Sequence, residues 1–137
     1  MITSRSRYGL LLLIDLVDHG TEGPIDIASV ARRQNIPEAY LAKLIAPLKS
    51  AGIVATLRGP KGGLSLAKPP RSTSMLEIVE ALEGGSGFGG GYEEGRKSEA
   101  GDKAARTWLA LDVVIKKGLA EISLEDASTA TALEYHI

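Results

Sequence analysis

The residues best suited to chemistry are basic side chains at three places in the first half of the chain. Arg5 and Arg7 lie near its start, Lys43 lies in a predicted helix, and Arg58 and Lys61 flank a turn rich in glycine and proline. Guanidinium and ammonium groups donate hydrogen bonds to phosphate oxygens, and an arginine beside a glycine-rich turn can enter a narrow minor groove, where the potential is most negative. These residues therefore favour nucleic-acid binding, with ordinary solvated surface charge as the alternative.

The distribution of charge supports the first interpretation. Residues 1–71 contain ten Lys and Arg against five Asp and Glu, a net charge of +5, whereas residues 72–137 contain six against twelve, a net charge of −6. The net charge of −1 for the whole chain hides this asymmetry. A basic first half and an acidic second half indicate that only the first half meets a polyanion.

Other kinds of chemistry find little support. The chain has no cysteine and only two histidines, His19 and His136, so a disulfide or thiolate metal site is impossible and other transition-metal sensing is poorly supported. No catalytic set of nucleophile, base and orienting group is recognisable, so we predict that the protein is not an enzyme and holds no cofactor. The lack of a long apolar run and of a signal-peptide layout predicts a cytoplasmic protein with no membrane partner.

Two helices are predicted before residue 35. The first is capped by Thr3 or Ser4 and runs to Asp18 with apolar residues almost all round, which is typical of a helix buried between layers. The second spans Ile27 to Gln34 behind a cap at Asp26. A tight break separates it from a third helix, and two helices joined in this way form a helix-turn-helix.

The third helix and the segment after it give the fold class. The helix ends near Gly52, and we expect packing to preserve it although Pro47 lies inside it. Short strands at residues 54–57 and 64–66 then enclose the basic turn at residues 58–63. A helix followed by a basic hairpin predicts a mainly α winged helix-turn-helix with a two-stranded wing. The apolar stripe of the third helix comprises Leu41, Leu44, Ile45 and Leu48.

The second half is predicted to contain two helices separated by a mobile loop. A helix covers Met75 to Glu83, residues 84–95 contain seven glycines, and a long helix spans residues 103–121. The long helix carries a stripe of apolar side chains that needs another surface to cover it. A second copy of the chain is the simplest such surface, and packing onto its own domain is the alternative. This predicted dimer interface comprises Trp108, Leu111, Ile115 and Leu119.

The elements divide the chain into three functional parts. Residues 1–71 form the predicted winged helix-turn-helix DNA-binding domain. Residues 72–101 form a helix and a flexible glycine-rich loop of the kind that meets an effector, and residues 102–137 form the dimerisation helix, a short helix starting at Ser123 and a tail.

These features together resemble a known family, the IscR–NsrR–CymR type (Rrf-two) of bacterial winged-helix transcription regulators. The resemblance runs from about Met1 to Ser128. Its most specific pieces are the opening Ser-Arg-Ser-Arg-Tyr at residues 4–8, the Tyr-Leu pair at residues 40–41, and Ala-Gly-Ile-Val at residues 51–54 running into Arg-Gly-Pro-Lys-Gly-Gly at residues 58–63.

The resemblance implies a homodimer on double-stranded DNA. The third helices would enter successive major grooves of a pseudo-palindromic operator, and the wings would lie in the flanking minor grooves. The protein would then be a sequence-specific regulator, most simply a repressor. The residues that the resemblance places on DNA are Ser4, Arg5, Arg7 and Tyr8 at the backbone, Glu38, Ala39, Tyr40 and Lys43 near bases, and Arg58, Gly59, Lys61 and Gly62 in the wing.

One departure from the family pattern matters. Members that bind an iron–sulfur cluster carry cysteines in the loop after the fourth helix, where this chain places Tyr92, Ser98 and Ala104, with Thr107 near a fourth ligand position. None of these side chains is a thiolate or imidazole, so we predict no cluster. The effector is then an unknown small molecule, a partner protein, or nothing. The competing interpretation of the whole chain is a protein-interaction module on a winged-helix scaffold.

Overall fold

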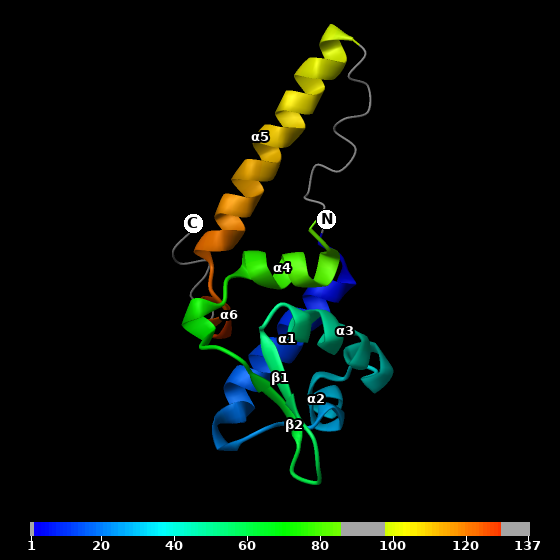
Figure 1. Cartoon of the computed structure of the whole chain (residues 1–137), viewed down its shortest axis with the longest axis vertical. Helices are drawn as coiled ribbons and strands as arrows, with labels where there is room; N and C mark the ends of the chain where they lie inside the picture. The colour runs from blue at the N-terminus through cyan, green and yellow to red at the C-terminus, as the bar shows by residue number, and fades with distance from the viewer. Residues whose placement is uncertain (1, 86–97, 130–137) are drawn as a thin grey trace.

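The computed structural model describes residues 2–85 and 98–129, and it confirms the mainly helical winged helix-turn-helix (Figure 1). The predicted glycine-rich loop lies largely outside these ranges, as does the predicted tail. The elements in chain order are α1 (Ser4–His19), the short 3₁₀ helix η1 (Gly20–Glu22), α2 (Ile27–Gln34), α3 (Glu38–Ser50), β1 (Val54–Leu57), β2 (Gly63–Leu66), the 3₁₀ helix η2 (Pro70–Ser72), α4 (Met75–Glu83), α5 (Glu99–Glu121) and α6 (Leu124–Ser128).

Helix α1 is the centre of the fold. It packs against α2, α3, α4, α6 and β2. Leu12, Leu13 and Leu16 are buried, but Tyr8 and Leu11 remain 38% exposed. The expectation of a helix buried nearly all round therefore holds for the side of α1 that carries Leu12, Leu13 and Leu16 and is wrong for the face that carries Tyr8 and Leu11.

Short polar caps begin α1 and α2, as the sequence predicted. The Asp26 carboxylate accepts a hydrogen bond from the Ser29 amide at 3.1 Å, which satisfies one of the free N–H groups of α2. Thr3, rather than Ser4, caps α1, and its hydroxyl accepts from the Arg5 amide. Helix α3 continues through Pro47 with Leu44 and Leu48 buried, so packing preserves it as expected.

The wing is an antiparallel pair with an added bridge that the sequence did not reveal. Val54 lies opposite Leu66, and Leu57 opposite Gly63. The backbone of Ile25 also pairs with Leu64, with N···O distances of 2.8 and 2.7 Å. A Cβ at Gly63 would lie 2.4 Å from the Ile25 carbonyl oxygen, so this position requires glycine. The bridge fixes the wing to the segment that leads into α2.

Helix α5 begins at Glu99, four residues before the predicted start at residue 103. The Ser98 hydroxyl caps it by accepting from the Gly101 amide at 2.9 Å, so Gly101 lies inside the first turn instead of preceding the helix. Figure 1 shows α5 projecting away from the winged-helix body, with α4 between them.

No helix in the described part of the chain has both the length and the hydropathy to cross a membrane.

Candidate nucleic-acid interface

Two aromatic side chains join the start of α1 to the start of α3. The rings of Tyr8 and Tyr40 meet edge to face, with centroids 5.2 Å apart and planes at 75°. The Tyr40 hydroxyl also donates to the Ser4 hydroxyl oxygen at 3.3 Å. Three of the predicted site residues thus lie together, although they come from positions 36 residues apart. The first turn of α1 and the start of α3 consequently form one surface.

Helix α3 presents the predicted face outward. Glu38, Ala39 and Lys43 are exposed, and Tyr40 is partly buried by its contact with Tyr8. The opposite side of α3 enters the core through Leu41, Leu44 and Leu48. The side chains that the sequence assigned to base contact are therefore free to meet a partner.

The basic side chains of this surface are available for phosphates. Arg5, Arg7, Lys43, Arg58 and Lys61 are all exposed. Within residues 2–85 and 98–129, no carboxylate forms an ion pair with any of the five. In the view of Figure 1, α3 and α2 lie between the first turn of α1 and the tip of the wing.

The first strand of the wing is held by the end of α3. The Lys49 ammonium donates to the Thr56 hydroxyl oxygen at 2.8 Å. Gly59 is exposed with φ of 109°, and a Cβ at Gly62 would collide with the Leu57 carbonyl oxygen at 2.1 Å. This turn therefore needs Gly59 for its positive φ and Gly62 for close backbone packing. It leaves Arg58 and Lys61 at its edges.

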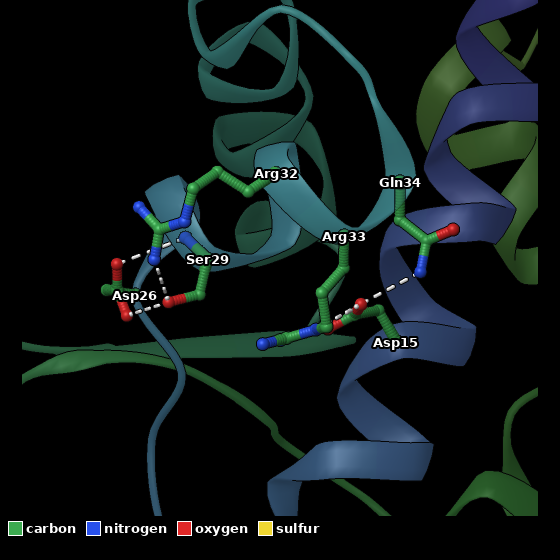
Figure 2. Close-up of polar contacts among 6 residues, drawn as sticks. All are labelled: Asp15, Asp26, Ser29, Arg32, Arg33 and Gln34. Atoms are coloured by element: carbon green, nitrogen blue, oxygen red, sulfur yellow. Dashed lines mark hydrogen bonds and ion pairs between the residues drawn. The ribbon is translucent and has the colours of Figure 1, made fainter.

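A buried ion pair between α1 and α2 was not visible in the sequence. The Asp15 carboxylate is 1% exposed and accepts from Nε and Nη2 of Arg33, at 3.0 and 2.7 Å, and from the side-chain amide of Gln34 at 2.9 Å (Figure 2). Burial raises the pKa of Asp15, but hydrogen bonds from Arg33 and Gln34 outweigh it and hold the pKa below its ordinary value. Asp15 thereby fixes α2, the first helix of the helix-turn-helix, to the central helix.

A second carboxylate, Glu83, holds the start of α1 from the end of α4. It accepts from the Thr3 amide at 2.7 Å, from the Thr3 hydroxyl at 2.7 and 2.9 Å, and from the Ser6 hydroxyl at 2.6 Å. Partial burial raises its pKa, yet the hydrogen bonds from Ser6 and Thr3 lower the pKa below its ordinary value. Since Glu83 occupies this helix end, the exposed side chains of α1, and not its first amides, are the groups left for phosphates.

Known proteins that resemble this chain identify its family. The model of the family Rrf2, described as iron-dependent transcriptional regulators, matches residues 2–130. The chain belongs to the Rrf2 family. Its members are transcriptional regulators and not enzymes, so the chain is a bacterial helix-turn-helix regulator that binds DNA, and the resemblance seen in the sequence is confirmed.

Individual Rrf2 relatives cover nearly the whole chain. The regulator CymR of Bacillus subtilis is 32% identical over 131 residues, which is 95% of this chain and 91% of CymR. The solved structure of CymR, the global cysteine regulator of B. subtilis, superposes with a TM-score of 0.79 over 95% of this chain and 97% of that one at 31% identity. The IscR structure from T. potens superposes with a TM-score of 0.74 over 96% of this chain and 88% of that one, also at 31% identity. Because this chain has no cysteine, it has no thiolate with which to hold an iron–sulfur cluster.

Proposed function

We propose that this protein acts as a homodimeric, sequence-specific repressor on a pseudo-palindromic operator, without an iron–sulfur cluster. The observation that carries the proposal is the joined surface of α1 and α3, on which exposed basic side chains lie beside a recognition helix tied through Tyr8 and Tyr40. In this arrangement α3 enters the major groove, the start of α1 contacts the phosphate backbone, and Arg58 enters the minor groove. A dimer bound over a promoter represses because it excludes the polymerase.

The long helix supports the dimer. Most of the exposed large apolar side chains in the described ranges lie on α5, among them Trp108 at 50%, Leu111 at 43% and Ile115 at 39%. Contiguous exposed apolar surface of this kind marks an interaction site. A two-fold dimer that pairs the two α5 stripes covers Trp108, Leu111 and Ile115, together with the half-buried Leu119, in both copies at once.

The proposal is tested by selecting duplexes from a random pool and measuring their affinity across a salt series. The selected duplexes should share two inverted half-sites, and their dissociation constants should rise steeply with salt, by about 0.9 logarithmic units per tenfold salt for each phosphate neutralised. A scrambled duplex should bind far more weakly at physiological salt. Failure to enrich any duplex, combined with no binding to the pool at low salt, would refute the proposal.

Replacing Arg58 by Ala tests the role of the wing. If Arg58 reads a minor groove, Arg58→Ala should weaken binding to the selected duplex by about 1–3 kcal/mol, most strongly where the flanking groove is narrow. A simple phosphate contact would cost less and affect all duplexes equally. Arg71→Ala, which removes an exposed arginine from η2, is the matched control. Unchanged affinity of Arg58→Ala would exclude Arg58 from the interface.

A further inference from the structure

The side chains that Glu83 holds lie in the same turn as the proposed phosphate contacts. Its carboxylate receives the Thr3 amide, the Thr3 hydroxyl and the Ser6 hydroxyl, all within 2.6–2.9 Å. Ser6 is 3% exposed and faces inward, whereas Arg5 and Arg7 on either side of it are exposed. Because the inner side of this turn is held, the backbone positions from which the two arginine side chains project are fixed.

The Thr3 hydroxyl carries this restraint into the helix itself. It donates to Glu83 and accepts from the Arg5 amide at 3.2 Å, so the cap and the carboxylate share one oxygen. A first helical turn frays readily because its amides have no partners within the helix. Charge-assisted hydrogen bonds to a carboxylate are about twice as strong as neutral ones and oppose that fraying.

Helix α4 connects this turn to the end of the proposed dimerisation helix. At one end of α4, Leu82 packs so closely on α1 that a Cβ at Gly9 would meet its Cδ1 at 2.2 Å. At the other end, the Met75 amide donates to the Ile122 carbonyl oxygen at 2.8 Å, directly after α5. The position of Glu83 is thus set by a helix fixed at both ends.

We propose that Glu83 is a positioning residue for DNA binding, which fixes the first turn of α1 through Thr3 and Ser6 so that Arg5 and Arg7 meet phosphates at the spacing set by the dimer. This inference rests on the proposed function. Glu83 itself carries a negative charge beside a phosphate-binding turn, so its presence there opposes binding by simple electrostatics. Its positioning effect must exceed that repulsion, which makes the direction of the mutational effect diagnostic.

The test is the substitution Glu83→Gln, measured with the selected duplex across a salt series. Gln keeps the size of Glu but offers one acceptor oxygen and an N–H₂ group that faces the Thr3 and Ser6 donors. We expect affinity to fall about tenfold and the salt slope to decrease by about 0.9 for each phosphate that is no longer neutralised. Glu80→Gln is the matched control, because Glu80 is an exposed carboxylate on α4 with no side-chain bond to α1, and its removal should leave affinity equal or slightly higher.

Two further measurements separate positioning from loss of fold. Amide hydrogen exchange of residues 2–8, without DNA, should accelerate in Glu83→Gln while the core of α1 around Leu12 and Leu13 keeps its protection. In an Arg5→Ala/Arg7→Ala background, Glu83→Gln should change DNA affinity much less than in the wild type, because its effect passes through those arginines.

Each outcome decides the matter. Affinity that is unchanged or tighter in Glu83→Gln overturns the positioning role. Lower affinity that comes with an unchanged salt slope, or with general loss of protection, overturns it too. Wild-type protein that binds no duplex overturns the proposed function and this inference with it. Wild-type binding that Glu83→Gln retains in full overturns this inference alone.

Discussion

Arg33→Met is expected to lower the free energy of unfolding at neutral pH by about 2–4 kcal/mol, because it leaves the buried Asp15 carboxylate with Gln34 as its remaining partner. The cost of removing one member of a buried pair is a charge left without compensation. This value is smaller than the cost of about 3–5 kcal/mol for breaking a fully buried pair. The Arg33 side chain is 35% exposed, and water reaching that side screens the charge that remains. Chemical denaturation measures the change.

The same pair predicts a pH dependence of defined sign. The groups around the Asp15 carboxylate are Arg33, Gln34 and, at longer range, His19, and together they hold its folded pKa below the value in the unfolded chain. The stabilisation is therefore fully present above the unfolded pKa of about 4 and is lost as the pH falls through the folded pKa. Without Arg33, burial raises the pKa of Asp15 in the variant above its wild-type value. The difference in unfolding free energy between wild type and Arg33→Met should therefore be constant above the Asp15 pKa of the variant, and should shrink as the pH falls through that pKa and then below about pH 4.

Arg32→Met is the matched control for this prediction. Arg32 is the neighbouring arginine of α2, and its guanidinium donates to the hydroxyl of the half-buried Ser29 at 3.2 Å (Figure 2). Loss of this surface hydrogen bond should change stability by less than about 0.5 kcal/mol. Equal stabilities of the Arg32 and Arg33 variants would show that the Asp15 pair contributes no more than a surface interaction.

Local signals in the sequence predicted the elements well, because the groups that decide them lie within one helical turn. The Asp26 cap is satisfied by Ser29, and the reciprocal box of Ser123 and Asp126 starts α6, each within three residues. The start of α5 was placed four residues late because Gly101 is a poor helix former. The Ser98 cap and the turns that follow stabilise the helix around it.

The contacts that organise the surface escaped prediction because they join distant parts of the chain. Glu83 reads locally as one more charge at the end of an amphipathic helix, and its partner Thr3 is 80 residues away. Asp15 likewise resembles a polar interruption in an apolar helix, because its partner Arg33 is 18 residues away in the sequence. A charged residue within an otherwise apolar stretch was the available signal for Asp15, since a buried charge requires a partner. The Glu83 hydrogen bonds offered no comparable signal.

Leu111→Lys is expected to abolish dimerisation, with a rise of at least about 10³-fold in the dimer dissociation constant. In the single chain this side chain is 43% exposed, so a lysine there should leave the winged-helix fold intact. In the proposed two-fold interface each copy contributes this lysine, so two charges must be desolvated. A rise of about 10³-fold in the dimer dissociation constant corresponds to about 4 kcal/mol in the free energy of dimerisation. Sedimentation at micromolar concentration measures the change in mass.

The consequence for DNA follows from the geometry of two half-sites. A monomer retains one α3 and one wing, so Leu111→Lys should keep weak, salt-dependent binding but lose its preference for the duplex with two inverted half-sites over the scrambled one. Ala110→Lys places the same charge one residue earlier on α5, about 100° around the helix and away from the stripe, and should stay dimeric and selective. Wild-type protein that sediments as a monomer, or a Leu111→Lys dimer as tight as the wild type, would remove the α5 stripe from the interface and leave its exposed apolar side chains to contact some other surface.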